Sequence, residues 1–416
     1  MLIFNLLVGA VIFSYYNSIT AKQQNIIDVH YNYYNTLYQI QCNIGTPSQD
    51  VLIMIDITSE INVLSPFAFD AKASRTLSQD NRMRINIQHE KRVLVDLARD
   101  KLYLHNSNNN TNDSVNISKF MFYYILIESS IKYNSIGLAM NYNEQHNTQF
   151  NIVSMLYQMG YINDMSFCLF EKTKYDGIWY IGGLPLETIK QEKLEHHIQC
   201  TGNTQAVLWN CKLNGVVVGD KVVLYDDNST SNYIALHNND TYILCPNNVY
   251  VYIHDIMMEY VQQGICTNFT STNGRSRYNV VCPCNLIKNF PNITLIINNY
   301  EMVLTYKEMF DDLIGQCFFN IESYPTTTTT TTCNNTNTGN NWLLGKTFIS
   351  KYIPIFHYTN KSLSFYSSTP FPQVHHTSSS SSSSLTLFLY KLLYILLLIS
   401  TLPNIIILIN INKINK

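Results

Sequence analysis

Charged residues are scarce in this chain, and neither sign dominates. Asp, Glu, Lys and Arg make up 13% of the 416 residues, and 27 basic against 29 acidic side chains leave a formal net charge of -2. The Lys and Arg residues are scattered and form no basic stripe of the kind that a polyphosphate partner requires. The composition therefore argues against nucleic acid as a partner.

Two further patterns are missing from the sequence. The cysteines of "CPC", Cys282 and Cys284, are followed by no Cys or His pair at zinc spacing, so we expect no metal and no cofactor. No short-period repeat is visible, although two related halves are compatible with the sequence. Hydrophobic residues, in contrast, are abundant: they make up 46% of the chain, which is enough to form a large core in two lobes or domains.

Both ends of the chain are apolar in a way that predicts the secretory pathway. Residues 1–21 contain a hydrophobic stretch of signal-peptide length followed by small residues, although no Lys or Arg precedes it. At the other end a Ser-rich linker, residues 371–384, leads into an apolar segment, residues 385–411, that is long enough to span a bilayer. We therefore expect an ectodomain that faces the lumen or the extracellular side, at the cell surface or in an endolysosomal membrane.

Two kinds of membrane anchor fit this tail. A spanning helix would retain the segment and place Lys413 and Lys416 on the cytosolic side. A GPI signal would instead use small residues of the Ser run as the attachment site and lose the apolar segment. The spanning helix is favoured, and the GPI signal remains the alternative.

The cysteines and glycosylation sequons agree with an oxidising, secretory environment. The chain has 10 Cys residues, an even number, so disulfides are expected. Eight Asn residues begin Asn-x-Ser/Thr sequons and are candidate glycosylation sites on exposed loops. These are Asn109, Asn112, Asn116, Asn228, Asn268, Asn292, Asn334 and Asn360.

Between its ends the chain has the pattern of a mostly β protein. Runs such as "LYQIQCNI", "VLIMIDI", "KVVLYDD" and "ITLIINNYEMVLTY" are short, rich in β-branched and aromatic residues, and separated by polar turns. Two stretches have helical periodicity instead, "FNIVSMLYQMGYI" and "NVYVYIHDIMMEYV".

The order of these segments resembles that of pepsin-like aspartic proteases. "YQIQCNIGTPSQDVLIMIDITSE" is similar to the opening of that family, "SIGLA" and "GIWYIGGLP" to internal strands, and "NWLLGKTFISKYIPIFHY" to the closing segment, with Lys346 and His357 where the family has acids. The resemblance implies a bilobal β fold with a cleft between the lobes, an N-terminal lobe at residues 30–190 and a C-terminal lobe at 191–370. It also implies a disulfide between Cys317 and either Cys282 or Cys284.

The resemblance places Asp56 at the first catalytic aspartate, and it leaves two candidates for the second. Aligning "IAL" and "YILCP" with the family's second catalytic turn puts His237 at the aspartate position. A rival alignment uses Asp227 and keeps an acid, but it leaves "ALHNNDTYILCP" without a counterpart. Strand and turn chemistry favours His237.

The chemistry of the family explains why this substitution matters. Two carboxylates share one proton and activate a water, because charges so close cannot both ionise. A His in place of one carboxylate would remove that arrangement. Neighbouring positions differ too: Ile57 replaces a hydroxyl residue whose side chain would bond across the two turns, and Thr58 and Asn239 replace glycines. His89 or Gln88 lies near the flap position that the family fills with Tyr.

Three functions follow from these residues. The favoured one is a catalytically inactive pepsin-like ectodomain, anchored at a membrane, that binds a peptide or protein in its cleft. The alternative is an active aspartic endopeptidase that uses Asp56 and Asp227. A third possibility is a structural or adhesion glycoprotein of the cell surface. The fold alone does not choose among them.

Overall fold

Strands dominate the structure, as the short β-branched and aromatic runs predict. The computed structural model describes residues 25–34, 37–87, 90–107, 114–126, 134–140, 151–225, 232–238, 242–268, 280–323 and 341–374. One sheet of 13 strands runs in the order β11-β26-β25-β9-β10-β1-β2-β3-β8-β4-β7-β6-β5. Its strands are β1 (Ile27–Tyr34), β2 (Leu37–Ile44), β3 (Gln49–Asp56), β4 (Val63–Leu64), β5 (Ser78–Ile87), β6 (Glu90–His105), β7 (Ser114–Ile125), β8 (Ser135–Gly137), β9 (Ser166–Thr173), β10 (Asp176–Ile181), β11 (His196–Thr201), β25 (Pro354–His357) and β26 (Ser362–Ser367).

Three smaller sheets and five helices make up the rest of the described fold. The sheets are, in order, β12 (Asn210–Lys212), β15 (Tyr233–Leu236), β24 (Trp342–Leu344), β16 (Ile243–Cys245) and β23 (Ile321–Ser323); β14 (Lys221–Tyr225), β13 (Gly215–Val218), β19 (Ile293–Ile297) and β20 (Tyr300–Leu304); and β17 (Thr267–Asn268), β18 (Val280–Pro283), β22 (Gln316–Phe319) and β21 (Phe310–Leu313). The helices are α2 (Ile152–Gln158), α3 (Leu186–Gln191), α4 (Asn247–Gln262), α5 (Tyr306–Met309) and α6 (Lys346–Lys351). The two predicted helices are confirmed as α2 and α4.

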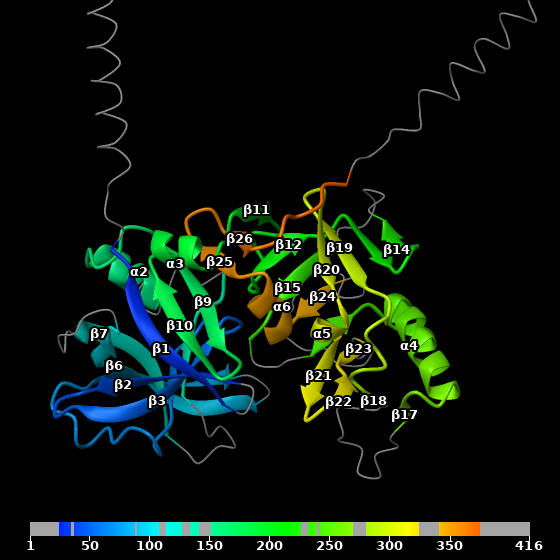
Figure 1. The fold of residues 1–416 in the computed structure, drawn as a ribbon. Helices are drawn as coiled ribbons and strands as arrows, with labels where there is room; N and C mark the ends of the chain where they lie inside the picture. Colours follow the sequence, from blue (N-terminus) through cyan, green and yellow to red (C-terminus); the bar gives the residue numbers. More distant parts are fainter. Residues whose placement is uncertain are drawn as a thin grey trace, which may run out of the picture. The chain divides into compact units, whose positions relative to one another are not determined.

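The same strand arrangement occurs twice in the chain. In the first half β3 pairs in parallel with β8, β8 pairs antiparallel with β4, and β4 pairs in parallel with β7. In the second half β15, β24, β16 and β23 repeat these three pairings in the same order. The blue and cyan strands of the first half and the green and yellow strands of the second gather in separate regions (Figure 1). The two halves are therefore related in topology.

Strands from both predicted lobes share the largest sheet. β25, β26 and β11 come from the second half of the chain, and β25 continues the sheet by pairing with β9 of the first half. Alternating burial along β2, where Ile40, Cys42 and Ile44 are fully buried, reflects the period of two that the sequence shows. All of these strands and helices lie in one compact unit, Met1–Pro372.

Three disulfides crosslink the second half of the chain. Cys200 bonds to Cys211, Cys266 to Cys282, and Cys284 to Cys317. Of the two partners that the resemblance left open for Cys317, the bonded one is Cys284. Cys282 lies opposite Cys317 in the β18–β22 ladder, yet its sulfur pairs with Cys266.

Three further cysteines, Cys42, Cys168 and Cys245, are free thiols, and all are buried. Burial raises the pKa of Cys42 to about 12, and it also raises the pKa values of the Cys168 and Cys245 thiols. Because the thiolate is the reactive form, these three side chains behave as small apolar core residues.

The predicted targeting and anchoring segments lie outside the described residues. These are the signal segment 1–21, most of the linker 371–384 and the membrane segment 385–411. Within the described ranges, no helix combines the length and the apolar character needed to cross a bilayer.

Candidate functional site

Asp56 is the last residue of β3, where the strand runs parallel to β8. In this ladder Ile55 pairs with Ile136 and Asp56 with Gly137, and the Leu138 N–H donates to the Asp56 carbonyl oxygen at 2.8 Å. A Cβ atom on Gly137 would lie 2.6 Å from backbone atoms of residues 59 and 61. The turn after Asp56 therefore folds back so closely that only glycine fits opposite it.

The Asp56 carboxylate is buried, at 1% exposure, and is held within its own turn. Its Oδ1 accepts from the Thr58 backbone N–H at 2.8 Å and from the Thr58 hydroxyl at 2.6 Å. A side chain at position 58 thus supplies a hydrogen bond that a glycine at that position could not. The carboxylate is stabilised by a residue two positions away in its own turn.

His237 lies at the corresponding place in the second half. Leu236 pairs with Leu344 in the parallel β15–β24 ladder as Ile55 pairs with Ile136, and His237 follows Leu236 as Asp56 follows Ile55. Gly345 likewise follows Leu344 as Gly137 follows Ile136. The strand pairing, taken together with the glycine that follows each partner strand, thus aligns Asp56 with His237.

The His237 ring is 4% exposed and bound to backbone. Its main-chain N–H donates to the Leu344 carbonyl at 3.1 Å, and its Nε2 lies 3.2 Å from the Tyr242 carbonyl oxygen. Because a carbonyl oxygen only accepts, Nε2 carries a hydrogen. The ring centroid is also 5.2 Å from that of Tyr242. Imidazole is therefore fixed in orientation at this position.

The two turns are joined by the amide of Asn238, which is fully buried. Its Oδ1 accepts from the Ile57 backbone N–H at 3.1 Å, and its Nδ2 donates to the Ile55 carbonyl at 2.6 Å. The sequence predicts that the apolar Ile57 loses a hydrogen bond between the turns. The sequence reasoning missed a second link: the side chain of Asn238, in the second turn, makes two hydrogen bonds to the backbone of the first turn.

Several candidate positions lie outside the described residues. These are Asp227, His89 and Asn239, and the sequon residues Asn109, Asn112, Asn228 and Asn334. The other four sequon residues, Asn116, Asn268, Asn292 and Asn360, all have exposed side chains. In the flap hairpin formed by β5 and β6, ion pairs join Arg82 to Asp96 at 3.0 Å and Arg99 to Asp80 at 2.7 Å.

Lys346, at the start of α6 directly after Gly345, is a buried cation. From the sequence it is recognised only as a basic residue at a position where the family has an acid. Its Nζ lies 3.4 Å from Glu171 Oε1, donates to the Lys174 carbonyl at 2.7 Å, and lies 3.3 Å from the centroid of the Tyr33 ring. Burial lowers the pKa of Lys346, while the Glu171 carboxylate opposes that shift. A cluster of charge and aromatic groups thus fixes α6 to β1 and β9.

His357 also replaces an expected acid and is partly buried on β25. Its Nε2 lies 3.0 Å from the Ser364 hydroxyl, and its Nδ1 lies 4.0 Å from Asp164. Burial lowers the pKa of His357, and the Asp164 carboxylate offsets only part of that effect. The neutral ring is therefore favoured in the folded state.

Because the folded pKa of His357 is lowered, stability should depend on it in acid. The contribution of the neutral ring is fully present above the unfolded value of about 6.5 and is lost as pH falls through the folded value. We expect His357→Gln to reduce the loss of Tm between about pH 7.5 and pH 5 by about 1–2 °C. The measurement is a pH series of thermal melts. His30→Gln on the exposed face of β1 is the control, and an unchanged slope in His357→Gln would contradict the prediction.

Comparisons with known proteins agree with this geometry. The family model of the eukaryotic aspartyl proteases matches residues 37–367. Cathepsin D of Dictyostelium discoideum is 32% identical over 93 residues, a match that covers 21% of this chain and 21% of that protein's own length. The crystal structure of basic 7S globulin from soybean superposes with a TM-score of 0.61 at 12% identity, covering 83% of this chain and 95% of that one. The mostly β, bilobal fold is thereby confirmed, and the chain belongs to the eukaryotic aspartyl protease family.

Proposed function

We propose that this member of the aspartyl protease family has lost acid proteolysis and binds a peptide or protein in its cleft. The carrying observation is the strand register that aligns His237 with Asp56. The family's reaction needs two carboxyl groups that share a proton around one water. An imidazole held by the Tyr242 carbonyl cannot act as the second carboxyl group.

Two features of the first turn support the proposal. The Oδ1 atom of Asp56 accepts two hydrogen bonds from Thr58, which fixes the carboxylate toward its own turn. The Asn238 amide joins the turns through the backbone at Ile55 and Ile57, so the apposition of the turns does not depend on a second acid. The scaffold of the site is thus retained while its acid–base pair is not.

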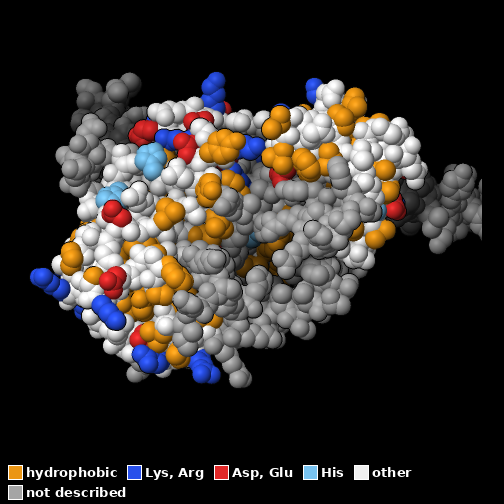
Figure 2. Space-filling model, turned by 90° about the horizontal axis from the view of Figure 1, so that it is seen from below, with side chains coloured by type: hydrophobic (Ala, Val, Ile, Leu, Met, Phe, Trp, Pro, Cys, Tyr) orange, Lys and Arg blue, Asp and Glu red, His pale blue; other side chains and the backbone are white. Residues whose placement is uncertain are grey.

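Retention of the cleft scaffold favours a binding role. On the face shown in Figure 2, described hydrophobic side chains gather beside a hollow near the middle of the molecule. A cleft suited to extended peptides retains its walls and its hydrogen-bonding backbone after the catalytic pair is lost, so affinity for peptide can outlast turnover.

The proposal also places the protein at a membrane of the secretory pathway. Three disulfides and four exposed sequon residues support an oxidising, lumenal environment for the body of the chain. The apolar segment at 385–411, with its Ser-rich linker, supports an anchor, either as a spanning helix or as a GPI signal.

The test is a protease assay on the purified full chain with an unfolded protein substrate from about pH 3 to pH 7. We expect no cleavage above background, with Asp56→Asn indistinguishable from the unaltered chain and an active pepsin-type enzyme as positive control. A mixture of unfolded peptides should raise the Tm in a saturable way and be recovered intact, as expected for a ligand of the folded state.

Turnover that Asp56→Asn abolishes would overturn the inactive assignment. In that case Asp227→Asn and His237→Ala decide which alignment holds: loss of turnover with the first and not the second would identify Asp227 as the second acid. A peptide mixture that leaves the Tm unchanged would remove the binding role while leaving the loss of catalysis standing.

A further inference from the structure

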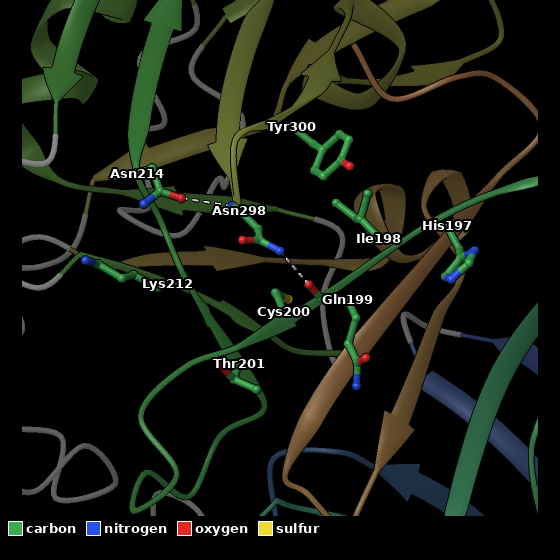
Figure 3. A pocket seen from close by; sticks show the side chains of 9 residues that line it. All are labelled: His197, Ile198, Gln199, Cys200, Thr201, Lys212, Asn214, Asn298 and Tyr300. Atoms are coloured by element: carbon green, nitrogen blue, oxygen red, sulfur yellow. Dashed lines mark hydrogen bonds between the residues drawn. The ribbon is translucent and has the colours of Figure 1, made fainter. Parts of the chain in front are cut away.

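A cavity of about 650 Å³ lies away from the two turns, beside strand β11. β11 forms the edge of the 13-stranded sheet, and residues at the end of β12 and in the hairpin that joins β19 to β20 complete the lining of the cavity (Figure 3). The lining residues are His197, Ile198, Gln199, Cys200, Thr201, Lys212, Asn214, Asn298 and Tyr300. None of them belongs to the turns around Asp56 and His237.

Asn298, at the tip of the hairpin between β19 and β20, links this wall of the cavity to strand β11. It adopts a left-handed conformation, with φ of 51°, and the next residue, Asn299, does the same at 66°. The Asn298 backbone N–H donates to Asn214 Oδ1 at 2.8 Å, and its side-chain Nδ2 donates to the Gln199 carbonyl at 3.1 Å (Figure 3). The tip of the hairpin is thereby fixed against the edge strand.

Three amide side chains of the wall are each tethered by one polar atom only. Asn298 uses its Nδ2, Asn214 uses its Oδ1, and Gln199 donates its Nε2 to the Ser362 hydroxyl at 2.9 Å. The opposite atoms, Asn298 Oδ1, Asn214 Nδ2 and Gln199 Oε1, have no hydrogen-bond partner in the part of the chain that the structure describes. The lining therefore offers two acceptors and one donor, on side chains that are each held by one hydrogen bond.

These groups define the chemistry of a ligand. The nine lining residues include no carboxylate, so the site is not built for a cation, and apart from Lys212 its hydrogen-bonding groups are uncharged or weakly basic. A ligand that uses these groups must both donate and accept hydrogen bonds, as the hydroxyl and acetamido groups of a sugar do. Tyr300 adds a planar ring that can pack against the C–H face of a sugar. We propose that this cavity binds a carbohydrate, with an N-acetylated sugar as the unit recognised.

One source of such a sugar is the chain itself. Asn360 begins an exposed sequon, and its Oδ1 accepts from the Ser362 hydroxyl at 2.7 Å. That same hydroxyl accepts from Gln199, so two hydrogen bonds connect the sequon residue to the wall of the cavity. The site thus takes either the first sugars of a glycan on Asn360 or a glycan of another protein, which share the same chemistry.

The probe is N,N'-diacetylchitobiose, titrated into the full chain and followed by calorimetry and ligand-observed NMR. We expect saturable binding that weakens at least tenfold in Asn298→Gly, which keeps the left-handed turn but removes the amide. Asn299→Gly, in the same turn but outside the cavity, is the matched control and should bind as the unaltered chain does. Gln199→Leu provides a second test of the wall on an exposed strand position, with thermal melts to verify folding.

Asn360→Gln distinguishes the two sources. If the chain's own glycan fills the cavity, chitobiose binds to Asn360→Gln and not to the glycosylated chain; if an external glycan is the ligand, both bind alike. Absence of saturable binding to either protein overturns the proposal, as does equal affinity in Asn298→Gly. Saturable binding of an extended tetrapeptide at this edge in preference to chitobiose would overturn it too, in favour of strand addition.

Discussion

Replacing Lys346 with Ala is expected to lower the free energy of unfolding by about 3–5 kcal/mol. The Lys346 side chain is 8% exposed and Glu171 is 19% exposed, so truncating the cation leaves a mostly buried carboxylate without its charged partner. The change also removes the hydrogen bond to the Lys174 carbonyl and the contact with the Tyr33 ring. Urea-induced unfolding at neutral pH measures the loss.

Helix α6 provides a matched control for this prediction. Lys351 pairs with Glu308 at 2.9 Å and donates to the Val303 carbonyl at 2.7 Å, but its side chain is 28% exposed. Since solvent can replace part of its interactions, Lys351→Ala should cost about 1 kcal/mol. A loss from Lys346→Ala no larger than that from Lys351→Ala would contradict the role of burial.

A double variant separates the pair from its surroundings. Lys346→Met combined with Glu171→Leu removes both charges and retains most of the volume, so the double variant should be markedly more stable than Lys346→Ala alone. The single variants Lys346→Met and Glu171→Leu are measured as well. If their losses of unfolding free energy simply add in the double variant, the ion pair contributes nothing specific, and the loss in Lys346→Ala reflects packing of the long side chain.

Local patterns in the sequence predict much of the fold. Alternation along Leu37–Ile44 predicts β2, and apolar spacing predicts helix α4, because both depend on residues close together in the chain. The position of Asp56 at the end of β3 is predicted from the series of segments that resemble the family in the same order. The resemblance is specific where strands and turns keep their order along the chain.

Local patterns do not predict which residues far apart in the sequence form hydrogen bonds, ion pairs or disulfides with one another. Asn238 bonds to backbone atoms of Ile57 and Ile55, which precede it in the sequence by 181 and 183 positions. No local pattern therefore marks its amide as a link between the turns. Lys346 is visible as a basic residue in place of an acid, but its partner Glu171 lies on strand β9, far away in the sequence. Cys282 and Cys284 are two residues apart, and only the tertiary structure decides which sulfur reaches Cys317.

Asn238 carries the other large expected effect, because it is a buried amide with both ends bonded to backbone. Asn238→Ala leaves the Ile57 N–H and the Ile55 carbonyl without these partners in a site that excludes water. Each buried polar group that loses its partner costs about 1–3 kcal/mol, so we expect a loss of about 3 kcal/mol in the free energy of unfolding. Denaturant unfolding measures it, with Asn62→Ala as a comparison, since Asn62 is another buried Asn that bonds to backbone.

The pH dependence of Asn238→Asp then tests whether the bond to the Ile55 carbonyl contributes. A protonated carboxyl group can accept from the Ile57 N–H and donate to the Ile55 carbonyl, whereas a carboxylate can only accept and meets the carbonyl oxygen unfavourably. The deficit of Asn238→Asp relative to the unaltered chain should therefore be smaller at about pH 4 than at about pH 7. A deficit that is equal at both pH values would show that donation to Ile55 does not stabilise the turns. In that case only the bond from the Ile57 N–H would contribute to the link that Asn238 makes between the turns.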